Sequence, residues 1–276
     1  MSDNRHKILE YLREIRGIDF SRYHPVLLEK QFAKRLQETG IENYDAYVRF
    51  LQQQPEELHQ LLDTLLVKYS LFFRDPLVFE MLGACVLPHI LQKKMNHADH
   101  AFRIWSAGCA TGEEPYSIAM LLNEWQRREE YPLDIHIFAT DVDEHAIEKA
   151  KVGVYAEENV HAVKYGWLRK YFVKEGTMFR LRAEIKRMVS FSAYDLTDHR
   201  TISPPDSIFG NFDLLFCRNV IIYFHEEVQT RILQKLARAL SKNGFLVLGE
   251  SEIIPAQYQG YFKQFCQCCK IYEKTH

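Results

Sequence analysis

The sequence lacks the features that would place the protein in a membrane or outside the cell. No apolar run approaches the roughly 18 residues that a membrane span requires. Residues 1–7 have no apolar core of the kind found in secretory signal peptides. Only six of the 276 residues are cysteine, and most stand inside apolar runs, which favours reduced thiols over a disulfide framework. We therefore expect a cytoplasmic protein with no membrane-inserted segment.

An excess of charge of either sign is also missing. The 35 lysines and arginines nearly balance the 37 aspartates and glutamates, which leaves a net charge of −2. A near-neutral chain gives no general reason to expect nucleic-acid binding, so we expect no nucleic-acid partner. One stretch departs from this balance, because residues 161–190 hold eight basic and two acidic side chains. A solvated face is the ordinary explanation, and a docking surface for an acidic partner is the alternative.

The sequence has little that resembles a metal site. None of the 12 histidines stands at a spacing typical of metal ligands. Cys266, Cys268 and Cys269 are close in sequence, but they fall in a segment that we expect to be a strand. Zinc would need a fourth ligand and a better spacing, so we expect no metal.

Two regions that differ in the spacing of their apolar residues follow one another along the chain. In the first, apolar residues recur at helical spacing, and Gly40 is a natural helix stop. Pro55 begins a further helix with Glu56 and Glu57 in its first turn, where the helix dipole favours acids. No strand pattern interrupts this region. We place an N-terminal all-α domain at residues 1–76.

Strands alternate with helices in the second region, residues 77–276. The expected strands are 102–107, 135–140, 188–194, 212–217, 245–248 and 265–272, and the expected helices include 144–151 and 226–240. This alternation predicts an α/β domain with a mostly parallel sheet covered on both faces. Residues 161–187 break the rhythm with a helix-like stretch and a short alternating run, so we expect a small antiparallel β insertion there.

The first strand of this domain leads into a glycine-bearing turn and then a helix. Such a turn lies beside the crevice where open α/β sheets bind ligands, and Gly108 and Gly112 permit close approach of the backbone. The turn lacks the three-glycine dinucleotide pattern, and Glu113 and Glu114 would repel a diphosphate but attract an ammonium group. Taken alone, the pattern is equally compatible with a purely structural turn.

Acidic residues also follow the second and third expected strands. Asp141 can accept hydrogen bonds from both ribose hydroxyls, although helix capping, which suits Asp143 better, is the alternative. Asp195 can accept from the exocyclic amine of adenine with Leu196 against the ring, although an ordinary strand-end aspartate is equally compatible. Together the three strand ends describe a pocket for an adenosyl amino acid. That ligand is S-adenosylmethionine, in a class I methyltransferase fold with a Rossmann-like doubly wound sheet.

Three stretches of the sequence resemble the signatures of one family. They are residues 71–75 (LFFRD), 112–117 (GEEPYS) and 216–224 (FCRNVIIYF). They occur in register over essentially the whole chain, which is similar to the CheR-type chemotaxis receptor glutamate O-methyltransferases. The resemblance implies S-adenosylmethionine-dependent methylation of glutamate side chains in the cytoplasmic helical region of chemoreceptors, with S-adenosylhomocysteine as the second product.

The resemblance also implies roles for individual residues. Arg74 would approach the methionine part of the cofactor and the reacting centre, and Tyr223 would face the substrate carboxylate, so these two are the catalytic candidates. The implied cofactor contacts are Ser70, Arg74, Gly108, Glu114, Asp141, Asp195, Leu196, Arg218 and Asn219. A domain-interface salt bridge is the alternative for Arg74, and without the resemblance Tyr223 and Phe224 would be assigned to the core.

Some positions depart from the family pattern. Lys68 stands where the family often has asparagine, Glu250 replaces a common histidine, and Asp195 replaces a common asparagine. The loop around Gly176 is shorter than in members that dock a receptor's C-terminal pentapeptide. The sequence therefore resembles the pentapeptide-independent members.

The expected chemistry needs no general base, because a glutamate carboxylate is already ionised near neutral pH. One alternative is a related methyltransferase that acts on another protein or on a small carboxylic acid. A cofactor-binding adaptor without activity is a second, and an RNA methyltransferase, which the charge balance disfavours, is a third. We expect the chain to be a monomer.

Overall fold

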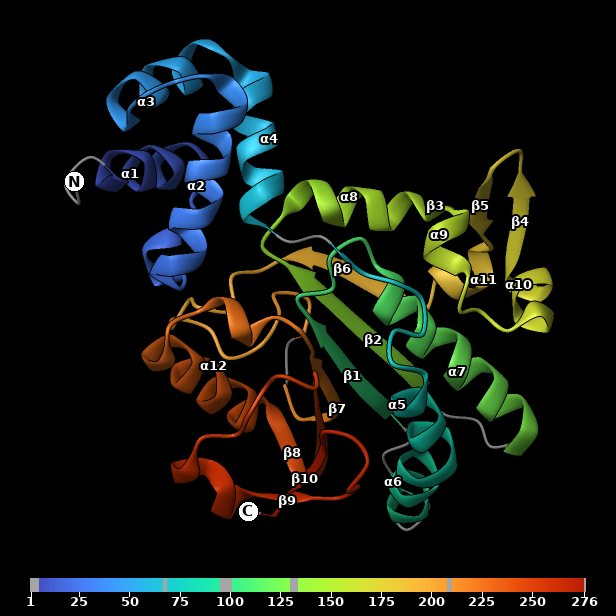
Figure 1. Ribbon diagram of the computed structural model, residues 1–276. Helices are drawn as coiled ribbons and strands as arrows, with labels where there is room; N and C mark the ends of the chain where they lie inside the picture. The colour runs from blue at the N-terminus through green and yellow to red at the C-terminus, as the bar shows by residue number, and fades with distance from the viewer. Residues whose placement is uncertain (1–4, 67–68, 95–100, 130–133, 208–209, 276) are drawn as a thin grey trace. The chain divides into compact units, whose positions relative to one another are not determined.

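The computed structural model describes residues 5–66, 69–94, 101–129, 134–207 and 210–275 of the chain. The chain divides into two compact units (Figure 1). The first comprises Met1–Lys68 together with Ile222–Gln229, and the second comprises Tyr69–Ile221 together with Thr230–His276. Residues 69–76, which the sequence analysis grouped with the N-terminal helices, pack with the second unit here.

The first unit is helical, as the sequence predicts. Its elements are α1 (Arg5–Arg16), η1 (Phe20–Arg22), α2 (Pro25–Thr39), α3 (Tyr44–Gln53) and α4 (Pro55–Leu65). Gly40 ends α2 with a left-handed φ of 70°, and its N–H bonds back to the last turn. Pro55 occupies the start of α4, with Glu56 and Glu57 in the first turn. Both helix boundaries follow from local chemistry that the sequence shows directly.

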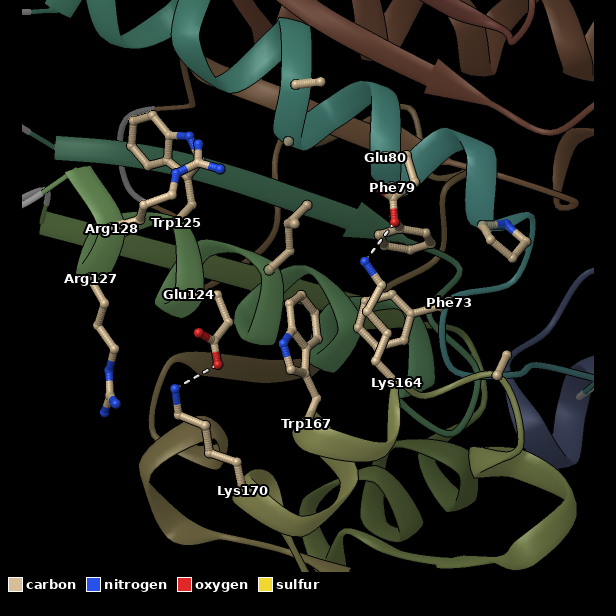
Figure 2. Close-up of a pocket in the computed structure, with 15 residues that line it drawn as sticks. Phe73, Phe79, Glu80, Glu124, Trp125, Arg127, Arg128, Lys164, Trp167 and Lys170 are labelled. Carbon is tan, nitrogen blue, oxygen red and sulfur yellow. Dashed lines mark hydrogen bonds and ion pairs between the residues drawn. The ribbon is translucent and has the colours of Figure 1, made fainter.

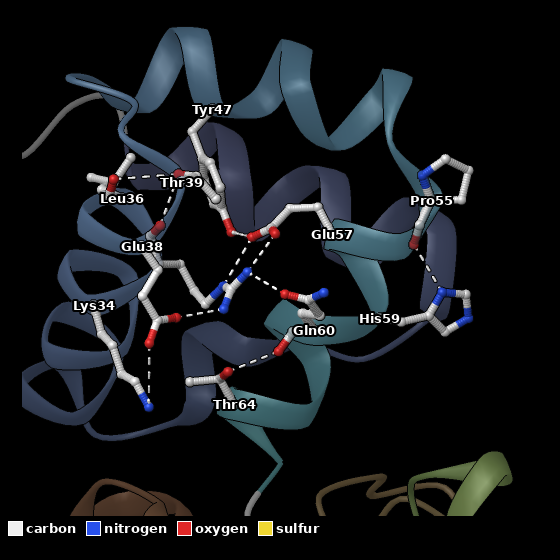
Figure 3. Close-up of polar contacts among 11 residues, drawn as sticks. Lys34, Leu36, Glu38, Thr39, Tyr47, Pro55, Glu57, His59, Gln60 and Thr64 are labelled. Atoms are coloured by element: carbon white, nitrogen blue, oxygen red, sulfur yellow. Dashed lines mark hydrogen bonds and ion pairs between the residues drawn. The ribbon is translucent and has the colours of Figure 1, made fainter.

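A polar network is buried within this helical unit (Figure 3). Arg35 donates from Nε to Glu57 Oε1 at 2.9 Å, and its Nη2 contacts the other carboxylate oxygen. Tyr47 donates its hydroxyl to the same Oε1 at 2.6 Å. Arg35 and Glu57 are only 8% and 6% exposed, so each compensates the buried charge of the other. Burial raises the pKa of Tyr47, which keeps its hydroxyl protonated as a donor.

A segment from late in the sequence completes the first unit. Tyr23 and Phe224 form an isolated antiparallel bridge, and the centroids of their aromatic rings lie 4.7 Å apart. The N–H of His24 donates to the Tyr223 carbonyl at 2.8 Å. The catalytic candidate Tyr223 therefore belongs to this unit, at the end of η3 (Ile221–Tyr223).

A seven-stranded sheet forms the centre of the second unit (Figure 1), in the order β6-β2-β1-β7-β8-β10-β9. The strands are β1 (Ala101–Ala107), β2 (Asp134–Asp141), β6 (Val189–Ala193), β7 (Phe212–Cys217), β8 (Leu240–Leu248), β9 (Phe262–Gln264) and β10 (Ile271–Lys274). The strands from β6 to β8 pair in parallel, and β10 and β9 add antiparallel edges. The strand order reverses between β1 and β7, so their carboxyl ends flank the switch point at which open α/β sheets bind ligands.

Helices connect the parallel strands, which confirms the expected α/β class. They include α7 (Glu113–Glu129) after β1, α8 (Glu144–Val152) after β2 and α12 (Glu226–Ala239) before β8. Before β1 lie α5 (Pro76–Met81), η2 (Leu82–Val86) and α6 (Leu87–Lys94), in a stretch that the sequence analysis left unassigned. Large aromatic side chains fill the core of the sheet, with Trp105, Phe212 and Phe216 fully buried.

A separate three-stranded antiparallel sheet forms the expected insertion. Its order is β3 (Val154–Ala156), β5 (Met178–Leu181) and β4 (Phe172–Glu175), accompanied by α9 (Glu157–Val160), α10 (Tyr165–Tyr171) and α11 (Ala183–Lys186). Gly176 turns between β4 and β5 with a φ of 62°. The sheet begins at Val154, earlier than expected from the sequence, because β3 is too short to show an alternating pattern.

The last expected strand, 265–272, is wrong. After η4 (Ala256–Tyr261), β9 ends at Gln264 and β10 begins at Ile271, so Cys266, Cys268 and Cys269 lie in the loop between them. The two short strands pair with each other in antiparallel register, which requires the chain to reverse between them. A separate finding concerns the helices: over the parts of the chain that the structure describes, none is both long and apolar enough to cross a bilayer.

Candidate active site

Glu114 is held at the carboxyl end of β1, in the first turn of α7. Ser106 of β1 donates its hydroxyl to Glu114 Oε1 at 2.7 Å. Arg218, which directly follows β7, donates from Nη1 to the other oxygen at 3.3 Å. Burial raises the pKa of Glu114, and the neighbouring guanidinium opposes that rise. The switch point of the sheet thus carries a carboxylate fixed by one hydroxyl and one cation.

Arg218 also holds the segment that contains Arg74. Its Nη2 donates to Asp75 Oδ2 at 2.5 Å and to the Arg74 carbonyl at 3.0 Å. The Arg218 side chain is only 3% exposed, and its Nε is buried without a partner among the described residues. Most of its donors therefore serve protein acceptors. The sequence analysis missed Asp75, although it stands in the LFFRD stretch directly after Arg74.

The backbone on either side of Arg74 is strained. Phe73 and Asp75 have left-handed φ angles of 54° and 59°. This conformation costs an L-residue about 1–2 kcal/mol, and such strain gathers at functional sites. The N–H of Phe73 is tied to the Ser117 hydroxyl at 2.9 Å. The Arg74 guanidinium itself donates to the Tyr69 carbonyl at 3.3 Å and lies 5.6 Å from the centre of the Tyr69 ring.

The turn after β1 is tied to the end of β2. The N–H groups of Gly108 and Cys109 both donate to the Thr140 carbonyl, at 2.8 and 2.9 Å. Gly108 has a φ of 76°, and a Cβ there would lie 2.3 Å from the Val220 side chain. Both the backbone conformation and the packing therefore require glycine at this position.

The carboxylate of Asp141 lies across the same turn. Its Oδ2 accepts from the N–H of Ala110 at 2.8 Å, and its Oδ1 accepts from the N–H of Asp143 at 3.0 Å. Burial raises the pKa of Asp141. The helix-capping role falls to Asp143, which accepts from the N–H of His145 at the start of α8 at 3.0 Å.

Asp195 and Leu196 follow β6, the strand beside β2. The N–H of Tyr194 donates to the Asp141 carbonyl at 2.9 Å, which keeps the two strand ends together. Asp195 accepts from the N–H and the hydroxyl of Thr197 at 2.7 and 2.6 Å, and these bonds orient its carboxyl group. Leu196 is buried, with 6% of its surface exposed.

Glu252 shapes the turn that carries Asn219. Its buried carboxylate accepts from the N–H groups of Val220 and Ile221, both at 2.8 Å, and from the N–H of Gly249 at 2.7 Å. Asn219 has a left-handed φ of 59°, and its Oδ1 is buried without a partner in the described part of the chain. A buried acceptor without a donor is costly, so this oxygen fits a ligand that brings an N–H or O–H group.

Glu252 was missed by the sequence analysis. It stands two residues after Glu250, in the GESE stretch, where only the replacement of a histidine by Glu250 was considered. Its partners lie about thirty residues earlier in the chain. No local pattern distinguishes a carboxylate that binds remote backbone N–H groups from one that faces solvent.

Glu113, the neighbour of Glu114, is satisfied inside the protein. It is 1% exposed and accepts from Thr111 Oγ1 at 2.8 and 2.9 Å and from Asn159 Nδ2 at 3.2 Å. Burial raises its pKa to about 7, and a hydrogen bond from Ser70 acts against that rise. Ser70, expected to contact the cofactor, thus has Glu113 as a hydrogen-bond partner.

A cavity of about 620 Å³ lies elsewhere in the second unit (Figure 2). Aromatic side chains from α5, α7 and α10 line it, among them Trp125 and Trp167. At its rim Lys164 pairs with Glu80 at 2.7 Å, and Lys170 pairs with Glu124 at 2.6 Å. Arg180 of the insertion is paired as well, with Glu175 at 2.7 Å. Part of the positive charge of the insertion is therefore compensated by nearby acids.

The strand-end residues fit the two ends of an adenosyl amino acid. Glu114 offers a carboxylate to an ammonium group, and Asp141 offers one to ribose hydroxyls, at the carboxyl ends of two adjacent parallel strands. The buried Oδ1 of Asn219 adds an acceptor without a protein donor. Tyr223 is described with the first unit, and Lys68 lies outside the described residues.

Comparison with known proteins decides the family. Residues 68–270 match the family model of the CheR methyltransferase SAM-binding domain, and residues 4–66 match that of the CheR methyltransferase all-alpha domain. The chain belongs to the CheR methyltransferase family.

Curated relatives of this CheR-family chain span nearly all of its length. It is 33% identical over 241 residues to a chemotaxis protein methyltransferase of Borreliella burgdorferi, covering 86% of this chain and 83% of the relative. It is 30% identical over 259 residues to the chemotaxis protein methyltransferase of Escherichia coli, covering 89% and 82%. Among solved structures, a DszA carbon methyltransferase aligns with a TM-score of 0.41 at 17% identity, over 88% of this chain and 50% of that one.

This CheR-family protein is an S-adenosylmethionine-dependent methyltransferase. The family resemblance, the class I methyltransferase fold with its N-terminal helical region, and S-adenosylmethionine as the cofactor are confirmed. The roles of single residues in binding and catalysis remain predictions.

Proposed function

We propose that this CheR-family methyltransferase acts in the cytoplasm and transfers methyl groups to glutamate side chains in the helical region of chemoreceptors. The products are glutamyl methyl esters and S-adenosylhomocysteine. The observation that carries the proposal is the pair of carboxylates, Glu114 and Asp141, at the ends of adjacent strands. The substrate class rests on the relatives, which are named chemotaxis protein methyltransferases.

The proposed cofactor site uses the strand ends of the second unit. S-adenosylmethionine, when bound, supplies an electrophilic methyl group on a sulfonium sulfur. Glu114 accepts from its ammonium group, Asp141 from its ribose hydroxyls, and Asp195 from its adenine amine beside Leu196. The remaining proposed contacts are Ser70, Arg74, Gly108, Arg218 and Asn219. Arg218 also holds the Glu114 carboxylate in place.

The chain's own residues act by alignment and not by proton transfer. A glutamate substrate is ionised near neutral pH, so its oxygen is nucleophilic without a general base. Arg74 and Tyr223 orient that carboxylate, Arg74 through its guanidinium and Tyr223 through its hydroxyl. The contact with Arg74 orients without tight pairing, because a close ion pair would lower the nucleophilicity of the oxygen. Correct orientation of two reactants is worth roughly 7–11 kcal/mol.

A single assay tests the reaction. The protein is incubated with methyl-labelled S-adenosylmethionine and receptor-bearing membranes, and the product is then treated with mild base. Release of volatile methanol is expected, because glutamyl methyl esters hydrolyse in base. Base-stable label would contradict the proposal and indicate methylation of nitrogen or nucleic acid. Label that appears only with receptor-free extracts would favour another protein or a small carboxylic acid as the substrate.

We further propose that methylation does not depend on a receptor's C-terminal pentapeptide. The short turn at Gly176, between β4 and β5, supports this proposal. Receptors truncated at the C-terminus should be methylated at the same initial rate as full-length receptors. A large drop in rate on truncation would contradict it.

The proposed organisation is an N-terminal domain at residues 1–76 and a cofactor-binding domain at 77–276, with the insertion at about 161–187. We propose that the protein is a monomer. Limited proteolysis, followed by mass analysis of the fragments, should cut first near the domain boundary. Light scattering coupled to gel filtration should give the mass of one chain, 32.6 kDa.

A further inference from the structure

Three thiols converge in the loop between β9 and β10. The Sγ atoms of Cys266, Cys268 and Cys269 all lie within 4.8 Å of one another. The Sγ atoms of Cys266 and Cys268 are 2.9 Å apart. Among the residues that the structure describes, no other three His, Cys, Asp or Glu side chains come together in this way. None of the three cysteines is among the residues proposed to contact the cofactor or the substrate.

Backbone hydrogen bonds hold this loop at both ends. The N–H of Phe265 donates to the Ile271 carbonyl at 2.8 Å, and the N–H of Ile271 donates to the Cys269 carbonyl at 3.0 Å. The N–H of Leu248, at the end of β8, donates to the Lys270 carbonyl at 2.9 Å. The loop is therefore anchored to the sheet, and the three thiols are gathered before any ligand arrives.

A side-chain contact adds to this anchoring. Gln264 donates from Nε2 to the Cys266 carbonyl at 2.9 Å. Since a preorganised site loses less conformational entropy on binding, a loop fixed in this way binds a ligand more tightly than a mobile one.

The number of thiols distinguishes between two kinds of chemistry. A disulfide uses two sulfur atoms and leaves the third without a role, whereas a metal ion uses all three. Zinc binds thiolate sulfur at about 2.3 Å, so tetrahedral geometry places neighbouring sulfurs about 3.8 Å apart. The Sγ atoms of Cys266 and Cys268, now 2.9 Å apart, must separate by about 1 Å to reach this spacing.

The three residues differ in solvent exposure, so the cluster has one buried thiol and one thiol that solvent can reach. Cys266 is buried, Cys269 is partly exposed, and Cys268 is exposed. An ion can therefore enter from the Cys268 side, and a water molecule can fill any further coordination position there. This arrangement removes the need for a fourth protein ligand, which was one of the two grounds on which the sequence analysis expected no zinc, the other being the spacing of the cysteines.

We propose that Cys266, Cys268 and Cys269 form a binding site for one thiophilic d10 metal ion, Zn(II) or Cu(I). Soft thiolate ligands select these ions. Three sulfurs complete a trigonal Cu(I) site, whereas Zn(II) takes one water as its fourth ligand. Binding releases the thiol protons to solvent and changes no oxidation state, so it requires no oxidant or reductant.

The experiment uses the purified full chain, fully reduced with a non-thiol reductant and freed of metal. Co(II) serves as the optical probe for Zn(II), because thiolate-to-cobalt charge transfer appears only when sulfur binds the metal. We expect saturation at one Co(II) per chain and bleaching by Zn(II). A parallel titration with Cu(I) against a chromophoric chelator distinguishes the two ions.

Serine variants identify the ligands. Each of Cys266→Ser, Cys268→Ser and Cys269→Ser should weaken metal binding at least tenfold. Cys85→Ser is the matched control, because Cys85 is a partly exposed cysteine in η2 and lies outside the cluster. It should leave the affinity unchanged. Since Cys268 is exposed, its replacement by serine should preserve the fold, which circular dichroism verifies.

Three results would overturn the proposal. The first is the absence of charge transfer in the reduced protein. The second is unchanged affinity in Cys268→Ser. The third is a disulfide within the cluster of the chain as isolated, detected as a loss of two mass units, together with no metal uptake after that disulfide is reduced. None of these readouts uses methyl transfer, so they test the metal site independently of the proposed enzymatic function.

Discussion

Replacement of Glu114 by glutamine tests the cofactor site most directly. Glu114→Gln keeps the side-chain shape and removes the negative charge. It also keeps an oxygen that can accept from the Ser106 hydroxyl, which lies 2.7 Å from Glu114 Oε1 in the wild-type protein. A hydrogen bond to a charged group contributes about 1.5–3 kcal/mol. We therefore expect binding of S-adenosylmethionine to weaken roughly 10- to 150-fold. Burial raises the pKa of Glu114, so the wild-type affinity should also fall as the pH drops through that raised value.

A matched variant separates cofactor binding from the loss of a partner for Arg218. Asp75→Asn also removes a carboxylate from this guanidinium, and its contact of 2.5 Å is shorter than the 3.3 Å contact with Glu114. If the pairing of Arg218 caused the whole effect, Asp75→Asn would weaken binding at least as much as Glu114→Gln. We expect Asp75→Asn to retain cofactor affinity within about threefold.

Isothermal titration with S-adenosylmethionine and S-adenosylhomocysteine is the appropriate assay, because both molecules carry the same ammonium group. The two ligands should lose affinity by a similar factor in Glu114→Gln. Wild-type affinity in Glu114→Gln would refute the reasoning, and so would an equal loss in Asp75→Asn. The second result would mean that Arg218 pairing shapes the site and that Glu114 makes no contact with the ligand.

Other substitutions test other parts of the molecule. Asp141→Ala should abolish cofactor binding in the same titration, and a wild-type affinity would remove the ribose assignment. Tyr223→Phe should keep cofactor affinity but slow methyl transfer, and unchanged turnover would exclude Tyr223 from the reaction. Glu57→Gln should lower the free energy of unfolding by about 1.5–3 kcal/mol in urea titrations, because it removes the buried carboxylate of Arg35 while the Glu38 carboxylate remains in contact with the guanidinium. Burial raises the pKa of Glu113 from 4.5 to about 7, so the folded state favours the neutral acid. The free energy of unfolding should fall by up to about 3 kcal/mol as the pH rises from 4.5 through 7, and Glu113→Gln should remove that decline.

Local chemistry in the sequence was sufficient for most helices and strands. Proline and acids at the start of α4, and glycine after α2, act within one turn of the residues that they affect. The apolar run that forms β7 has the same bounds in the structure, Phe212–Cys217, because a central parallel strand is buried on both faces. Such signals need no knowledge of the partner elements.

The candidate cofactor residues could be named for a similar reason. Parallel strands place their carboxyl ends on one edge of the sheet, so acids that directly follow β1 and β2 must lie near each other. Neighbouring residues on a helix point about 100° apart, however, and the sequence does not show which of them faces the core. Glu113 and Glu114 consequently have different surroundings, one satisfied by Thr111 and Asn159 and the other held at the switch point.

The sequence by itself determined the family, the α/β class, the parallel strands and the edge of the sheet that carries the site. Only the tertiary structure decided which side chains hold that site, because Asp75 and Glu252 act on backbone or side chains far away in the sequence. The tertiary structure also decided whether the C-terminal cysteines lie in a strand or in a loop. Their spacing is compatible with a strand, but the pairing of β9 with β10 forces the chain to reverse, and the reversal gathers three thiols that a strand would have kept apart.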